Sequence, residues 1–140
     1  MNTFYKSEDI CIKEDTRNNI VFINFLRSSV SELNYELYHD NIINVYDKYE
    51  KLNKKIVLIF DTTKLGTMFS LKFAKAEANF FKPLDDRTIK IVNSMYTICS
   101  SSIIKKGFNF FIELMGSPVP CKLVNSLEEA INQLSNINYA

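Results

Sequence analysis

The first part of the chain has the alternating pattern of β-structure. Apolar and polar residues alternate in "DICIKE" (9–14), and this period of two predicts a half-buried strand. "IVFINFL" (20–26) is rich in β-branched and aromatic residues and predicts a second strand. Residues 15–19, "DTRNN", lie between them and are typical of a turn. The pattern therefore predicts a β-hairpin.

The period then lengthens to three or four residues between 29 and 51, which predicts one long amphipathic helix. Ser29 or Ser31 is expected to cap its N-terminus, because a short hydroxyl side chain accepts a hydrogen bond from an unpaired N–H. The helix could bend at "HDN" (39–41). "KIVLIFD" (55–61) shows no alternation and predicts a central strand that is covered on both faces.

The second half of the chain continues with helices and strands in turn. A second helix is predicted at 68–82, and "PLDDR" (83–87) is expected to end it because proline breaks the hydrogen-bond ladder. A capping box of Ser126 and Glu129 marks the start of the last helix. The other predicted elements are a strand at 88–100, a helix at 101–115 and a short strand at 121–124.

The order of these elements is β-β-α-β-α-β-α-β-α. It predicts an α/β fold with one mixed sheet of about five strands and about four helices. No repeat or linker interrupts the pattern, and 140 residues suit a single hydrophobic core. We therefore expect residues 1–140 to form one domain.

Composition narrows the function classes. The net charge is +1, and the only basic runs are "NKK" (53–55) and "KK" (105–106). Nucleic acid is not an expected partner, because binding to it needs a concentrated basic face. No apolar run approaches the roughly 18 residues of a transmembrane helix, so no transmembrane segment is predicted. The N-terminal residues have no apolar signal core, and we expect a cytoplasmic location.

Cysteine and histidine give no sign of a metal site. Cys11, Cys99 and Cys121 are far apart in the sequence and are expected to be reduced thiols. The single histidine, His39, is expected to be a surface or packing residue. A structural zinc site needs four nitrogen or sulfur ligands, so neither a metal nor another cofactor is predicted.

The segment "DTTKLG" (61–66), between a predicted buried strand and a predicted helix, is the most distinctive motif. Together with the element order and the final "NSLEEAINQL" (125–134), it resembles the STAS family, the anti-sigma-factor-antagonist-like domains. The resemblance covers residues 9–135. The chain is similar also to the lipid-binding CRAL-TRIO domains, which share that overall fold, through "KPLDDRTIKIVNS" (82–94).

The STAS resemblance implies a regulatory or contact loop at 61–70. In that family the matching strand ends in Asp, and a D-S-S-G-like loop follows whose Ser or Thr can be phosphorylated. Asp61 stands at the strand end, but the loop has no Asp-Ser pair. The candidate interaction or phosphoacceptor residues are Asp61, Thr62, Thr63, Thr67 and Ser70.

Catalysis is not predicted. Acid-base or nucleophilic chemistry needs two suitable groups close together. Asp61 is the only acid that we expect at the carboxyl end of a central strand, where ligands bind in open α/β sheets. No partner for Asp61 can be identified, and "DTTKLG" (61–66) lacks the glycines of a phosphate loop. The simplest alternative for this segment is a strand end whose side chains bond local backbone N–H groups.

The helices predicted at 68–82 and 101–115 have wide apolar faces. A helix that covers a sheet needs an apolar stripe of only about 100°. Core packing is the simplest role for most of the rings, and we expect the remaining surface to meet a partner, a second copy or a ligand. The candidate residues for this apolar surface or pocket are Phe69, Phe73, Phe80, Phe108 and Phe111.

The favoured hypothesis is a non-enzymatic protein-interaction or regulatory module. It would act through the loop 61–70 and the apolar helix surfaces on a protein partner or a second copy. The first alternative is a small carrier or sensor of a lipid or other apolar ligand, as the CRAL-TRIO resemblance implies. A viral or scaffold-associated structural protein is a further alternative, because abundant Asn, Ile and Lys are typical of AT-rich genomes.

Overall fold

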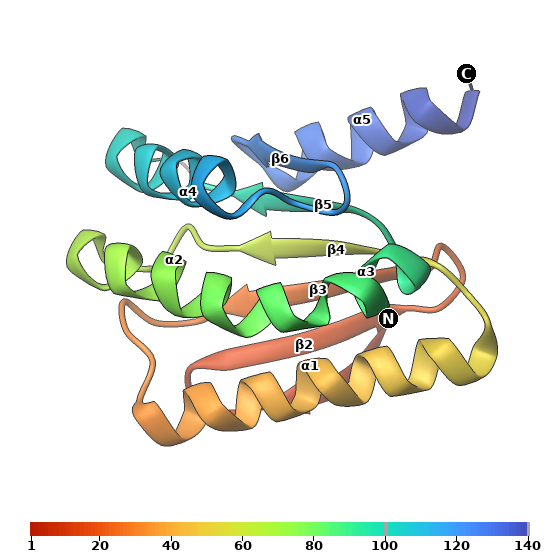
Figure 1. Ribbon diagram of the computed structural model, residues 1–140, viewed down its shortest axis with the longest axis horizontal. Helices are drawn as coiled ribbons and strands as arrows, with labels where there is room; N and C mark the ends of the chain where they lie inside the picture. Colours follow the sequence, from red (N-terminus) through yellow and green to blue (C-terminus); the bar gives the residue numbers. More distant parts are fainter. Residues whose placement is uncertain (100, 140) are drawn as a thin grey trace.

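The computed structural model (Figure 1) describes residues 1–99 and 101–139, with their side chains except those of 67–71, 111, 114, 115 and 136–139. The strands are β1 (Asn2–Lys6), β2 (Ile10–Asp15), β3 (Ile20–Phe25), β4 (Ile56–Asp61), β5 (Val92–Ile98) and β6 (Cys121–Val124). The helices are α1 (Glu32–Leu52), α2 (Thr67–Phe81), the 3₁₀ turn η1 (Lys82–Leu84), α3 (Asp85–Ile91), α4 (Ser102–Met115) and α5 (Leu127–Tyr139).

The described strands form one mixed sheet in the order β1-β2-β3-β4-β5-β6. β1, β2 and β3 are antiparallel neighbours, whereas β3, β4, β5 and β6 are parallel neighbours. Each parallel connection contains a helix, because parallel strands cannot be joined by a tight turn. The predicted α/β class and the β2–β3 hairpin are therefore confirmed.

The two faces of the sheet are covered by different helices. In Figure 1, α1, α2 and α4 lie in front of the strands, and their buried residues share one core cluster with Ile12, Ile23 and Leu58 of the sheet. Ala130 of α5 belongs to a second cluster with Ile59 and other strand residues that point the opposite way. Residues 56–60 of β4 are all buried and contribute to both clusters, as expected for a central strand.

The sequence pattern missed β1 (Asn2–Lys6), so the sheet has six strands rather than about five. β1 is an edge strand whose five residues are exposed or only partly buried. Its pairing with β2 is irregular between Thr3 and Tyr5. A short, half-exposed and irregular strand has too few apolar positions to show a period.

Part of the strand predicted at 88–100 was wrong, because residues 85–91 form α3 and β5 begins at Val92. Asp85 and Asp86 occupy the first turn of α3, where the helix dipole favours acidic side chains. The predicted end of the preceding helix is confirmed to within one residue, because α2 ends at Phe81, but the 3₁₀ turn η1 and α3 follow it directly. Pro83 lies in the first turn of η1, where a missing N–H breaks no bond, so the chain continues as helix.

The predicted helix start is confirmed for one of its two candidates. The Ser31 side chain accepts a 3.2 Å hydrogen bond from the Asn34 N–H and caps α1, which runs unbroken through residues 39–41. The capping box before α5 is present in altered form. Ser126 Oγ accepts a bond from the Glu129 N–H, but the Glu129 carboxylate bonds the Asn125 N–H.

Candidate functional site

The loop after β4 is held by its own side chains. Asp61 is the last residue of the strand, and its Oδ1 accepts hydrogen bonds from the Thr63 N–H at 3.0 Å and from Thr63 Oγ1 at 2.7 Å. The Asp61 side chain therefore bonds a local backbone N–H, which is the simplest role that the sequence allowed for it. Thr63 and the following Lys64 are exposed.

Thr62 points into the molecule. Its side chain is fully buried, and both its N–H and its Oγ1 donate to the Ile98 carbonyl, at 3.0 and 2.8 Å. These bonds join the end of β4 to the end of β5. Thr62 thus has its hydroxyl in a structural bond and away from solvent.

The far end of the loop is anchored at Gly66. Its N–H donates a 2.8 Å bond to the Ser28 carbonyl, and a Cβ at this position would lie 3.3 Å from that oxygen. Glycine therefore allows the loop to approach the segment between β3 and α1. The side chains of Thr67 and Ser70, the other predicted members of the loop site, lie outside the described residues.

A polar depression opens beside this loop, on the face of the sheet opposite α1, α2 and α4. It has a volume of about 370 Å³. Asp61, Thr63 and Lys64 line it from the loop. The other polar walls come from β1, β2 and β3 and include Lys6, Lys13 and Asn24. The sequence pattern did not identify these three residues as members of a site. It did not predict β1, and it could not show which residues of neighbouring strands are paired.

The predicted apolar surface lies mainly inside the structure, as far as its side chains are described. Phe73 is buried, with its ring edge-on to Phe25 at 4.9 Å between centroids and to Phe108 at 6.2 Å. Phe108 is also buried, and Phe80 is partly buried and stacks on His39 with centroids 3.8 Å apart. The side chains of Phe69 and Phe111 lie outside the described residues.

A buried acid that sequence reasoning missed joins α1 to α2. Glu77 Oε1 accepts a bond from Tyr35 Oη at 2.7 Å and lies 2.8 Å from His39 Nε2. Glu77 Oε2 accepts a bond from Tyr38 Oη at 2.9 Å. Burial and the nearby Glu77 charge raise the pKa of Tyr38 well above its ordinary value. Both tyrosines are therefore neutral donors to the carboxylate.

This cluster has the residue types of an acid-base site but little space for a substrate. Both Glu77 oxygens are engaged by the tyrosines and histidine of α1. The neighbouring hollow between α2 and α4, lined by Glu77, Phe73 and Phe108 among others, has a volume of about 60 Å³. Pockets for small-molecule ligands are usually about 300–1,000 Å³. The geometry fits a buried bridge between helices.

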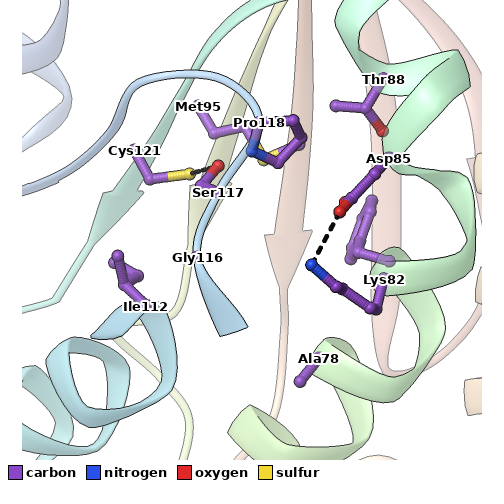
Figure 2. Close-up of a pocket in the computed structure, with 11 residues that line it drawn as sticks. Ala78, Lys82, Asp85, Thr88, Met95, Ile112, Gly116, Ser117, Pro118 and Cys121 are labelled. Carbon is purple, nitrogen blue, oxygen red and sulfur yellow. Dashed lines mark hydrogen bonds and ion pairs between the residues drawn. The ribbon is translucent and has the colours of Figure 1, made fainter. Parts of the chain in front are cut away.

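A second small hollow lies between α2, α3 and the segment 116–120, as Figure 2 shows, with a volume of about 80 Å³. At one wall Lys82 Nζ lies 3.1 Å from Asp85 Oδ2, and at the other Ser117 Oγ lies 3.0 Å from Cys121 Sγ. Burial raises the pKa of the Cys121 thiol, which disfavours the nucleophilic thiolate. This hollow therefore offers no activated nucleophile.

The outer face of α4 exposes apolar side chains. Ile103 and Phe110 are 53% and 66% exposed, and their spacing of seven residues places them on one side of the helix, two turns apart. The exposed Lys106 and Glu113 lie on the same stripe. This α4 stripe (Ile103, Lys106, Phe110 and Glu113) contains the most exposed phenylalanine among the described side chains, and α1 also exposes Leu33 and Leu37.

Two further findings concern the described part of the chain. It contains no cluster of three His, Cys, Asp or Glu side chains that could hold a metal ion. None of its helices combines the length and the apolar character needed to cross a bilayer. Comparison of the chain with protein-family models, with curated proteins and with solved structures found no match.

Proposed function

We propose that the protein is a non-enzymatic protein-interaction or regulatory module built on a STAS-like α/β domain. The observation that carries this proposal is the α4 stripe, where a phenylalanine and an isoleucine are more than half exposed. Exposed aromatic and aliphatic groups gathered on one face are typical of protein-protein contact sites. The exposed Thr63 and Lys64 of the loop after β4 form a second contact surface.

The partner that suits the α4 stripe best is a second copy of the chain. In a two-fold contact each residue i meets residue j while j meets i. If two α4 helices pair antiparallel about a point between residues 109 and 110, Lys106 of each copy faces Glu113 of the other. Phe110 of each copy then lies near the axis. The stripe is thus complementary to itself in charge and apolar at its centre.

The hollows support a contact role over the carrier role. The two hollows beside α2 measure about 80 and 60 Å³, below the range of about 300–1,000 Å³ that encloses small-molecule ligands. Phe73 and Phe108, which would line a lipid pocket, instead pack against each other. The three free cysteines suit a reducing compartment such as the cytoplasm.

The test is sedimentation equilibrium of the wild-type chain and of the double variant Ile103→Ser/Phe110→Ser. We expect the wild type to dimerise and the variant to be monomeric with the wild-type circular dichroism spectrum, because both side chains are on the surface. Leu33→Ser/Leu37→Ser is the matched control, since these α1 leucines are also exposed. A monomeric wild type, or a control that dissociates equally, would refute the α4 contact.

A further inference from the structure

The polar depression beside the loop is lined by three lysines, and the contact at the α4 stripe uses none of them. We propose that it binds a small phosphate-bearing molecule that also carries hydroxyl groups, such as a sugar phosphate. The phosphate would lie among Lys6, Lys13 and Lys64, and a hydroxyl would donate to Asp61. These four residues are called the lysine site below.

The register of the sheet explains why these residues meet. Lys6 of β1 is paired with Cys11 of β2, Cys11 with Asn24 of β3, and Asn24 with Asp61 of β4. Directly paired residues of neighbouring strands point to the same face. A single row across four strands therefore presents Lys6, Asn24 and Asp61 on the face opposite α1.

Lys13 and Lys64 complete the positive rim. Lys13 lies two residues from Cys11 on β2 and so points to the same face. Lys64 follows Asp61 in the loop that Thr62 and Gly66 anchor at its two ends. The depression is open on this side because α5 contacts β5 and β6, at the other end of the sheet.

The charges of the lysine site are not compensated within the described structure. Lys48, Lys82 and Arg87 each form an ion pair with a carboxylate, whereas Lys6, Lys13 and Lys64 form none with the carboxylates that the structure describes. Three lysines therefore line one depression together with a single acidic residue, Asp61. Ammonium groups that converge in a cleft favour a phosphate through charge-assisted hydrogen bonds.

The remaining groups of the depression suit hydroxyls. Asp61 uses Oδ1 for the two bonds from Thr63, which leaves Oδ2 to accept a bond from a ligand hydroxyl. Asn24 adds an amide that can donate and accept. The volume of about 370 Å³ falls within the range of small-molecule sites, and the site lies beside the carboxyl ends of parallel strands.

A second depression provides a matched comparison. It lies at the amino ends of the parallel strands, has a volume of about 400 Å³ and is lined by Lys54, Lys55 and Lys90. Its carboxylate, Glu50, already bonds Arg87. The two depressions are thus similar in size and number of lysines, but the Glu50 carboxylate is ion-paired with Arg87, whereas Asp61 forms no ion pair with another described residue.

The experiment is isothermal titration calorimetry of the purified chain with glucose 6-phosphate and, separately, with glucose. We expect saturable one-to-one binding of glucose 6-phosphate and none of glucose. The variant Lys6→Ala/Lys13→Ala should weaken binding at least about tenfold, because each lost charge-assisted bond is worth about that factor. Lys54→Ala/Lys90→Ala should leave the affinity unchanged. All four lysines are exposed, so both variants should keep the wild-type circular dichroism spectrum.

Three results would overturn the proposal. They are no binding of glucose 6-phosphate, an equal loss of affinity in both variants, and binding to phosphatidate vesicles without binding to glucose 6-phosphate. An equal loss of affinity in both variants would indicate that the ligand is attracted by the overall positive charge and not by the lysine site. Binding to the vesicles alone would indicate a lipid headgroup as the source of the phosphate. The titration needs no partner protein, so its failure would leave the α4 contact untouched.

Discussion

Replacing Glu77 with alanine tests whether the buried cluster stabilises the fold. The substitution removes the acceptor of two tyrosine hydroxyls and the partner of the His39 ring. Tyr38 is completely buried, so its hydroxyl cannot turn to water, and a buried donor without a partner costs about 1–3 kcal/mol. Tyr35 and His39 are partly exposed and regain water at a smaller cost.

The sum of these effects is about 3 kcal/mol. A domain of this size has about 5–15 kcal/mol of stability in total, so the loss is large. Urea unfolding followed by far-UV circular dichroism measures this loss of unfolding free energy directly. The melting temperature should fall by about 10 °C, because about 1 kcal/mol corresponds to about 3 °C for a chain of this length.

The control is Glu36→Ala, which removes an exposed glutamate from α1 and should change the stability by less than about 0.5 kcal/mol. The double variant Tyr38→Phe/Glu77→Ala isolates the buried hydroxyl. Without that hydroxyl, removing Glu77 should cost about 1–2 kcal/mol less. If Glu77→Ala matched Glu36→Ala in stability, the cluster would not be holding α1 to α2.

Four further substitutions have expected outcomes in the same unfolding assay. Thr62→Val should cost about 1 kcal/mol, because it removes the buried bond to the Ile98 carbonyl, whereas exposed Thr63→Ala should cost less than about 0.5 kcal/mol. Bonds from the Asn34 side chain and the Ser31 N–H lower the pKa of Asp9 below its ordinary 3.8. That stabilisation is present above pH 3.8 and is lost as the pH falls through the lower folded value. Asp9→Asn should therefore be less stable than wild type at pH 7, and the difference should shrink towards pH 3. Arg87→Ala should cost no more than about 1 kcal/mol, and less in high salt, because its pairs with Asp47 and Glu50 are exposed to solvent.

Periodicity predicted the elements whose buried face is wide and regular. The hairpin, α1 and α4 have enough apolar positions to be recognised, and β4 was predicted by its unbroken apolar run rather than by a period. Periodicity failed for β1 and α3, which are short. α3 depends on Asp85 and Asp86 in its first turn and on a bond from Thr88 to Tyr46 of α1. A contact between segments that are far apart in the sequence cannot be predicted from the hydrophobic pattern of either segment.

The buried acid could have been suspected from the sequence. The helix predicted at 68–82 has its polar residues in a stripe through Lys72, Lys75, Asn79 and Lys82, and Glu77 falls outside it. A charged residue on an apolar helix face needs a buried partner. Tyr35, Tyr38 and His39, spaced by three and four residues on α1, provide the donors. The identity of that partner depends on how α1 and α2 pack against each other. The hydrophobic pattern of a single segment does not predict this packing.

The two proposed surfaces lie on opposite faces of the sheet, and this separation limits how they can affect each other. The α4 stripe is on the face that α1 and α2 share, whereas the lysine site is on the face that α5 partly covers. A small ligand in the depression therefore does not block a second copy at α4 by direct contact. One covalent and hydrogen-bonded link runs from Asp61 through Thr62 to the end of β5, the strand that precedes α4 in the chain. If ligand and dimer influence each other, Thr62→Val should weaken that coupling while leaving each separate binding event intact.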